Sequence, residues 1–263
     1  DIDDWIFSFP SYSGGHVSNK ENFCHNIIAL ADVVTVANAE LLSRMPHVMP
    51  NVAPILLPNG MWVERYSGAH RYETQLSSPR ILFTNADFLK VESAKDDILT
   101  ALHIFFSNHP DYVLDFFGDP FPEMFSLPFL HFTNRIPYQN YMRSIAAGGY
   151  AFAITPLGAD EDENSAKFNA CKNPFKYINY GTAGIPGIYS SAVIYKSCVQ
   201  HGKTGLLTDN TYKSWIDSLE LMARDTCLRK NIREQAYADV SDRFHVRHSG
   251  RILSKIINEL VLR

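Results

Sequence analysis

Hydrophobic residues recur along this chain in short runs that are separated by helical patterns. Runs rich in β-branched and aromatic residues, bounded by polar or turn residues, indicate strands. The predicted strands of the central region lie at 81–83, 112–117, 130–132, 150–154 and 185–190. Between them, apolar residues at helical spacing predict helices at 96–108 and 138–147. Strands that alternate with helices of this length predict an α/β fold, a Rossmann-like parallel sheet with helices on both faces.

A shorter α/β pattern precedes this region and predicts part of a second domain. The β-branched run at 33–37 indicates a strand, and Asn38 can cap a following helix that ends at Pro46. The turn signal at 58–60 begins a stretch, 59–79, that carries little periodicity. We expect the chain to cross between two domains there.

The last third of the chain is predicted to be helical. Apolar residues share one face in each of three segments, which contain Trp215, Leu219 and Met222, then Leu228, Ile232 and Ala236, then Ile252, Ile256 and Leu260. The acidic stretch at 160–163 is expected to be a solvated loop.

Composition excludes several classes of protein. The 263 residues are 46% hydrophobic and 20% charged, which is the balance of a globular chain and not of a fibrous or disordered one. A formal net charge of −4 gives no bulk reason to expect nucleic acid as a partner, so an anion site must be local. The sequence contains no apolar run near the roughly 20 residues that span a bilayer. Its four cysteines lack CxxC spacing, which predicts free thiols and a cytoplasmic protein, and the start at Asp1 suggests an excised fragment.

One segment, 168–181, combines a helix start with a group of polar residues. Asn173 followed by Pro174 predicts that a helix begins there. Lys172, Lys176 and Asn179 would then form one stripe along that helix. The neighbouring stripe, expected to face the core, contains Cys171, Phe175 and Ile178.

The two lysines of this stripe have two explanations. Cations at a helix N-terminus oppose the helix dipole, and a bound phosphate would remove that conflict. The position after a strand of a parallel sheet favours such an anion site, because ligands bind at the carboxyl ends of the strands. Alternatively, Lys172 and Lys176 are surface residues whose stems cover apolar neighbours. The residues alone leave both explanations open.

Several short motifs follow one another along the chain in a recognisable order. They are Ala31–Val36, Leu57–Gly60, Arg80–Phe83, Lys172–Gly187, Gly202–Leu207, and Asp225 with Leu228-Arg229. Together they resemble the GT-B glycosyltransferases of the retaining family 4 type (glycosyl transferases group 1), and the resemblance covers nearly the whole chain. It implies the tail of an N-terminal acceptor domain and hinge at 1–74, a nucleotide-sugar-binding domain at 75–245, and a final helix at 246–263 that packs back toward the first domain.

The resemblance also implies roles for single residues. It places the interdomain hinge at 58–60 and a donor-binding loop at Asn85–Lys90. In this loop Lys90 keeps the charge that meets the diphosphate, whereas Ala86 stands where the family has an arginine. Arg135-Ile136 matches the segment that meets the nucleobase through its backbone.

Both carboxylates of the family's E-x7-E pattern are replaced. Cys171 stands at the first position and Asn179 at the second, where the family's glutamate accepts hydrogen bonds from the donor ribose. Asn179 can still accept through its amide oxygen, without a charge. Tyr180 beside it completes the donor-binding set, and Lys172 and Lys176 fall near the donor phosphates as the predicted catalytic residues.

The function implied is the transfer of a sugar, with retention, from a nucleotide-diphosphate sugar to a glycan or lipid-linked acceptor, as in polysaccharide biosynthesis. Lysines would offset the charge on the departing diphosphate, so neither a metal nor a cofactor is expected. Nucleic acid is not an expected partner. Peripheral membrane association is expected only through regions of the parent protein that lie outside this sequence. One alternative is a non-catalytic GT-B-like scaffold or binding domain, which Cys171 and Asn179 favour. A sugar-nucleotide epimerase is disfavoured, because no acidic pair is placed for proton abstraction.

Overall fold

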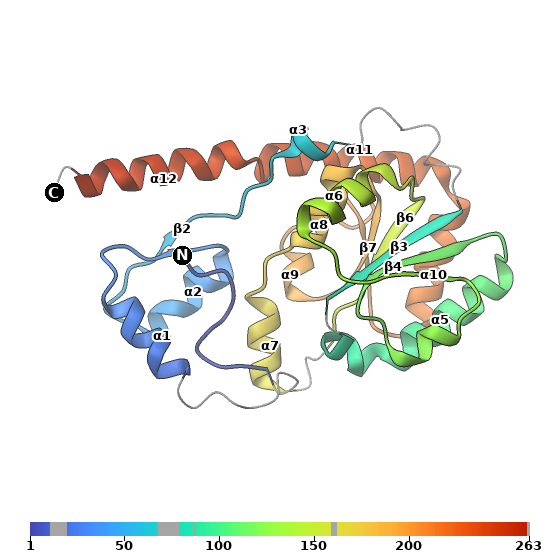
Figure 1. Ribbon diagram of the computed structural model, residues 1–263, viewed down its shortest axis with the longest axis horizontal. Helices are drawn as coiled ribbons and strands as arrows, with labels where there is room; N and C mark the ends of the chain where they lie inside the picture. Colours follow the sequence, from blue (N-terminus) through green and yellow to red (C-terminus); the bar gives the residue numbers. More distant parts are fainter. Residues whose placement is uncertain (11–19, 68–78, 87, 159–161, 262–263) are drawn as a thin grey trace. The chain divides into compact units, whose positions relative to one another are not determined.

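The structure is a computed structural model that describes residues 1–10, 20–67, 79–86, 88–158 and 162–261 (Figure 1). These residues form two compact units. The first, here the N-terminal unit, contains Asp1–Trp62, Asp160–Pro174 and Arg243–Arg263, and the second, the sheet unit, contains Val63–Ala159 and Phe175–Asp242. The predicted donor-binding domain at 75–245 includes 160–174, which in the structure packs with the N-terminal unit. The domain limits at 74 and 245 stay a prediction.

The sheet unit is built on six parallel strands. Their bounds are β3 (Arg80–Asn85), β4 (Val113–Gly118), β5 (Leu130–Thr133), β6 (Phe152–Thr155), β7 (Gly187–Ser190) and β8 (Leu206–Thr208). Their spatial order is β5-β4-β3-β6-β7-β8, and every neighbouring pair is parallel. This is the doubly wound Rossmann order. From β3 the chain adds strands first on one side, as β4 and β5, and then on the other, as β6, β7 and β8, so the strand order reverses between β3 and β6. The predicted α/β fold class is therefore confirmed, and β8 is a strand that the sequence pattern did not predict.

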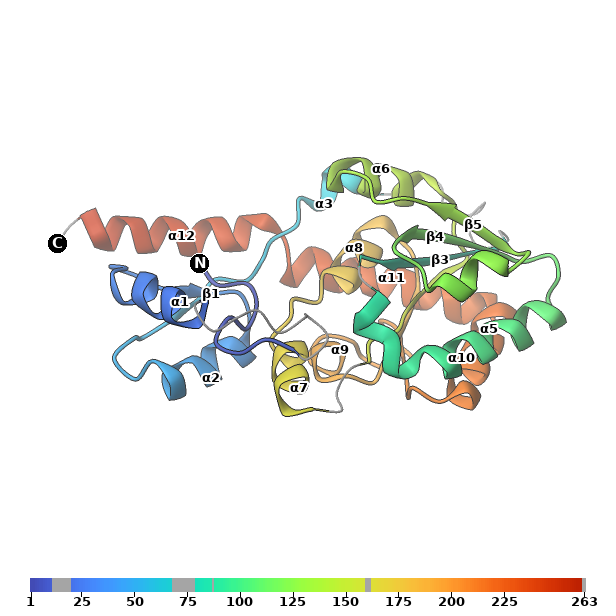
Figure 2. The ribbon, with the colours of Figure 1, turned by 60° about the horizontal axis from the view of Figure 1, so that its bottom comes forward.

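Helices cover both faces of this sheet. The described helices of the sheet unit are α3 (Val63–Tyr66), the 3-10 helices η2 (Phe88–Ala94) and η3 (Pro122–Ser126), α5 (Lys95–Asn108), α6 (Tyr138–Ala147), α8 (Phe175–Ala183), α9 (Val193–Lys196), α10 (Tyr212–Arg224) and α11 (Thr226–Arg243). Figure 2 shows α6 and α5 on opposite sides of the strands. Among the helices of the described residues, none has the length and apolar character needed to cross a bilayer.

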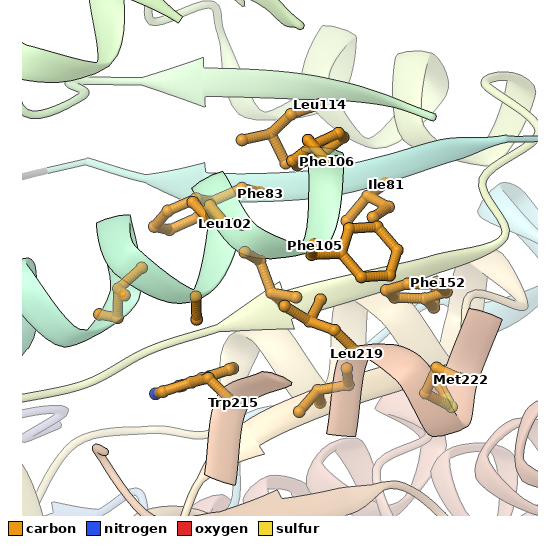
Figure 3. Close-up of a cluster of buried hydrophobic side chains, with 14 of the residues drawn as sticks. Ile81, Phe83, Leu102, Phe105, Phe106, Leu114, Phe152, Trp215, Leu219 and Met222 are labelled. Carbon is orange, nitrogen blue, oxygen red and sulfur yellow. The ribbon is translucent and has the colours of Figure 1, made fainter. Parts of the chain in front are cut away.

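The core of the sheet unit lies between the strands and the paired helices α5 and α10 (Figure 3). The strands contribute alternate residues that point to this face, as strand geometry requires. The core contains Ile81, Phe83, Leu114 and Phe152 from strands, Leu102, Phe105 and Phe106 from α5, and Trp215, Leu219 and Met222 from α10. The apolar faces predicted for these two helices are therefore confirmed. The residues between these core residues on each strand point to the opposite face of the sheet. Thr84 is one of them, and it contacts Tyr180 of α8 there.

The N-terminal unit has its own small core and sheet. Its elements are α1 (Lys20–Ala29), β1 (Thr35–Val36), α2 (Ala39–Val48), β2 (Ile55–Leu56), α7 (Glu163–Ala170) and α12 (Val246–Val261). The two strands are parallel, and Ile2 donates its backbone N–H to the carbonyl of Thr35 at 2.8 Å. Buried residues of this core include Trp5, Val36, Leu41, Met45 and Cys171.

Helix α2 begins as the sequence predicts and ends later. The Asn38 side chain accepts a hydrogen bond from the backbone N–H of Leu41 at 2.9 Å, so it caps the helix. The prediction that α2 ends at Pro46 is wrong, because the helix continues to Val48. Pro46 lacks one N–H, yet the N–H of Met49 still bonds the Met45 carbonyl at 2.9 Å, and both methionines are buried. Packing of this last turn therefore offsets the missing hydrogen bond.

Helix α7 replaces part of the loop that the acidic stretch predicted. The Asp162 carboxylate accepts from the backbone N–H of Ser165 at 2.9 Å, and Glu163 lies in the first turn. Acidic side chains stabilise a helix N-terminus by capping and by interaction with its dipole. The solvated-loop prediction is wrong for these two residues, because their charge serves to start a helix.

Candidate functional site

A cavity of about 290 Å³ lies in the sheet unit, at the carboxyl ends of β3, β4 and β5. Its walls come from these strand ends, from α6 and from the start of α8. The lining residues are Thr84, Asn85, Ala86, Phe117, Gly118, Asn134, Arg135, Ile136, Tyr138, Tyr141, Lys176 and Asn179. Since β3 borders the point where the strand order reverses, the cavity occupies the place where sheets of this topology bind ligands.

The ends of β3 and β4 approach each other closely at one wall of the cavity. Gly118 has a φ of +116°, and a Cβ atom there would lie 1.9 Å from the carbonyl oxygen of Asn85. The same oxygen accepts the backbone N–H of Asp119 at 2.7 Å. Gly118 is not selected by any sequence motif or by the family resemblance, yet its lack of a side chain permits the close contact that forms this wall.

Arg135 ties the loops at the rim of the cavity together. Its guanidinium donates to the carboxylate of Asp119 and to the carbonyl of Ala86. The side chain is 61% exposed, so the ion pair is largely hydrated. Arg135 and Ile136, the segment that the resemblance assigns to the base, both line the cavity, and that assignment stays a prediction.

Asn179 and Tyr138 form a hydrogen-bonded pair within the cavity wall. Asn179 is 5% exposed, and its Oδ1 accepts from the Tyr138 hydroxyl at 2.8 Å. Tyr138 is 48% exposed, and its partial burial raises the pKa of the hydroxyl to about 12, with a smaller contribution from Tyr66. The hydroxyl is protonated at neutral pH, as in any tyrosine, and it acts as the donor to Oδ1.

Tyr180, the residue after Asn179, supports the cavity from behind and does not line it. Its buried hydroxyl lies 2.8 Å from Oγ1 of Thr84, which is a lining residue. Burial raises the pKa of Tyr180 to about 12. Tyr180 therefore contacts a lining residue and is not itself one, and its assignment to donor binding stays a prediction.

The two predicted catalytic lysines lie in different units. Lys176, in the first turn of α8, lines the cavity. Lys172 belongs to the N-terminal unit, where its Nζ lies 3.8 Å from the centre of the Phe168 ring, a cation–π contact.

The prediction of one helical stripe through both lysines is wrong. Helix α8 starts at Phe175, whereas Lys172 follows Cys171, the C-terminal cap of α7. Asn173 does not belong to α8, because helical conformation is sterically unfavourable for a residue that directly precedes proline. Its side chain instead donates to the Asp3 carbonyl at 2.7 Å. Phe175, predicted to face the core, is 41% exposed.

Of the two remaining predicted donor-binding residues, Asn85 lines the cavity and Lys90 does not. Asn85 ends β3, is buried, and lines the cavity. Lys90 lies in η2 and is not one of the lining residues, and its backbone carbonyl accepts from the N–H of Gly158 at 3.0 Å. The structure therefore brings together Asn85, Arg135, Ile136, Lys176 and Asn179.

The chemistry of the cavity suits an anion that carries a planar polar group. The described lining residues include two cations, Lys176 and Arg135, three aromatic rings and three asparagines, but no carboxylate. Sequence reasoning missed Tyr138, Tyr141 and Gly118, although the residues that follow each predicted strand already point to this edge of the sheet. Within the described part of the chain, no three His, Cys, Asp or Glu side chains are grouped as metal ligands would be.

The fold is similar to that of solved GT-B glycosyltransferases. No protein-family model matches the chain, and no curated protein matches it. Sucrose-phosphate synthase from Thermosynechococcus elongatus matches 93% of this chain with a TM-score of 0.64 and 14% identity. A mutant of S. aureus TarM, in complex with Fondaparinux, alpha-GlcNAc-glycerol and UDP, matches 98% of it with a TM-score of 0.71 and 8% identity.

A third match concerns one domain. The C-terminal domain of a glycosyl transferase group 1 family protein (LpcC) from Francisella tularensis matches over its whole length, covering 71% of this chain with a TM-score of 0.53 and 12% identity. The chain spans 62% of the length of the synthase and 49% of that of TarM. At these identities the likeness is one of fold, and it agrees with the parallel sheet described above.

Proposed function

We propose that this chain, which shares its fold with GT-B glycosyltransferases, carries the donor-binding part of such an enzyme. Its cavity would bind the nucleotide part of a nucleotide-diphosphate sugar, whose sugar passes to a glycan or lipid-linked acceptor. The observation that carries the proposal is the cavity at the carboxyl ends of β3, β4 and β5, where lysine, amide and aromatic side chains converge. The S. aureus TarM structure of the same fold was solved with UDP.

Lys176 is the residue to which we assign leaving-group stabilisation. A positive charge fixed near the departing diphosphate offsets the charge that develops there, and this lowers the barrier to transfer. Lys172, assigned the same role from the sequence, and Lys90, assigned to the diphosphate, stay predictions. The same holds for retention of configuration, for polysaccharide biosynthesis, for the cytoplasmic location, for peripheral membrane association and for the lack of a cofactor or metal.

Nucleotide binding by the purified chain tests this proposal. Titration calorimetry with UDP, GDP and ADP should show binding of at least one of them. Lys176→Met should weaken that binding about 5–10-fold, because a charge-assisted contact to phosphate is lost. Lys230→Met removes an exposed lysine of α11 that does not line the cavity, and it should leave the affinity unchanged. If none of the nucleotides binds, the proposed function is wrong.

A non-catalytic binding or scaffold domain of the same fold is the second candidate function. It is favoured by the lack of a carboxylate among the described lining residues, and by Asn179 and Cys171 at the positions where the resemblance implies glutamates. The two candidates differ in turnover. An enzyme hydrolyses a bound UDP-sugar or transfers its sugar, and so releases UDP, whereas a binding domain leaves the UDP-sugar intact. Chromatography of the nucleotides after incubation distinguishes these two outcomes.

A further inference from the structure

We infer that Tyr138 is a positioning residue, which holds the Asn179 amide so that its nitrogen, and not its oxygen, is offered to the ligand. The nucleoside diphosphate would then be held at Asn179 through an oxygen that accepts a hydrogen bond, not through a hydroxyl that donates one. This inference rests on the proposed function and specifies how the same cavity recognises its ligand.

The geometry of the pair carries the inference. Tyr138 begins α6 and Asn179 lies in α8, two helices that pack together, and both residues line the cavity. The Tyr138 hydroxyl donates to Asn179 Oδ1 at 2.8 Å, and no other side-chain hydrogen bond of Asn179 occurs among the described residues. One end of the amide is thus occupied by the protein, and the other end, Nδ2, remains to be paired.

The free end of the amide is accessible from the cavity. Asn179 as a whole is almost fully buried, yet its Nδ2 is not one of the buried unpaired side-chain atoms, and it has no acceptor among the described residues. A ligand oxygen in the cavity would supply that acceptor. The Tyr138 hydroxyl is protonated at neutral pH, as in any tyrosine, so it carries the proton that it donates to Oδ1.

Asn179→Asp is the variant that separates donor from acceptor. Aspartate has nearly the same shape and still accepts from Tyr138, but it has no N–H group. We expect UDP to bind Asn179→Asp at least about 10-fold more weakly, because one hydrogen bond is lost and a negative charge faces the diphosphate. Asn179→Ala should weaken binding without adding that charge. Unchanged or tighter UDP binding by Asn179→Asp would overturn the inference, because a carboxylate gains only where the ligand donates.

A double-mutant cycle tests the role of Tyr138. Tyr138→Phe should weaken UDP binding about 3–10-fold in the wild-type background and have no effect in the Asn179→Ala background, because its role depends on that amide. Tyr141→Phe is the matched control: Tyr141 is also a lining tyrosine of α6, but its hydroxyl interacts with Thr84 and Tyr180 and not with Asn179, so its effect should be additive with that of Asn179→Ala. Additive effects of Tyr138→Phe and Asn179→Ala would contradict the assignment.

Nuclear magnetic resonance of the ligand-free protein provides a readout that does not depend on UDP. The side-chain amide signals of Asn179, identified by their loss in Asn179→Asp, should shift in Tyr138→Phe and stay in place in Tyr141→Phe. Absence of a shift in Tyr138→Phe would overturn the positioning role even if UDP binds. If the wild type binds no UDP but the shift occurs, the positioning role stands, whereas the recognition of a nucleoside diphosphate at Asn179 falls with the proposed function.

Discussion

At the residue scale, the cavity depends on a position that only glycine tolerates. Gly118 combines a φ of +116° with a Cβ position 1.9 Å from a backbone oxygen, an atom that cannot move aside as a flexible side chain can. A left-handed conformation costs an ordinary residue about 1–2 kcal/mol, before any clash. The clash at Gly118 would have to be relieved by moving the ends of β3 and β4 apart, and both of these ends line the cavity.

We therefore expect Gly118→Ala to lower the free energy of unfolding by more than about 2 kcal/mol. Urea denaturation followed by circular dichroism measures this change. Gly202→Ala is the matched control, since Gly202 also has a positive φ, of +75°, but no atom lies within 4 Å of its Cβ position. It should cost only about 1 kcal/mol. Equal losses in the two variants would mean that the contact with Asn85 does not matter.

At the element scale, the structure differs from the sequence pattern mainly where a helix begins or ends. Asn38 shows how one side chain can serve two elements. Its oxygen caps α2, and its nitrogen donates to the carbonyl of Cys171 at 2.7 Å, directly after α7. The capping role follows from local sequence, whereas the second bond joins residues that are 133 positions apart.

Replacing Asn38 should therefore cost more than an ordinary helix cap. Loss of a cap costs about 1 kcal/mol, and loss of the bond to Cys171 adds about 1 kcal/mol, so Asn38→Ala should lower the free energy of unfolding by about 2 kcal/mol. Asn38→Ser keeps a capping oxygen and lacks the amide nitrogen, so it should lose about half as much. Urea unfolding curves of the two variants and the wild type measure both changes. The second role is refuted if Asn38→Ser is as stable as the wild type.

At the scale of the whole molecule, buried tyrosines and a buried thiol make stability depend on alkaline pH. Burial raises the pKa of Tyr180 from 10.0 to about 12 and that of the Cys171 thiol from 9.0 to about 12. Because the pKa of each group is higher in the folded than in the unfolded state, the group loses its proton at a lower pH in the unfolded chain. The stabilisation is therefore complete below the unfolded pKa, and it is lost as pH rises through the folded one.

We expect the free energy of unfolding to fall steeply between pH 9 and pH 12, the window set by these pKa values. Tyr180 alone should contribute a loss of about 1.4 kcal/mol per pH unit above pH 10. Urea unfolding at pH 8, 10 and 11, followed by tryptophan fluorescence, measures the slope. Tyr180→Phe should be less stable at pH 8 but should lose less between pH 10 and pH 11. An identical slope in the variant would show that Tyr180 does not titrate in this way.

The sequence by itself determined the fold class, because that class depends on local periodicity. The alternation of β-branched runs with helical spacing predicts the parallel sheet, and Leu102, Trp215 and Met222 are buried on the faces that their spacing indicates. The resemblance also selected residues that line one cavity. Among them are Asn85, which ends β3, and Arg135, which follows β5, and the carboxyl ends of these strands share one edge of the sheet.

Only the tertiary structure decided which of these residues meet. Lys172 and Lys176 are four positions apart, yet the first packs on Phe168 in one unit and the second lines the cavity in the other. Local pattern could not separate them, because it does not predict α7, the helix whose C-terminal cap directly precedes Lys172. Likewise, the pairing of Tyr138 with Asn179 depends on the packing of α6 against α8. Such contacts depend on chain packing in three dimensions, which a periodicity of two or 3.6 residues does not specify.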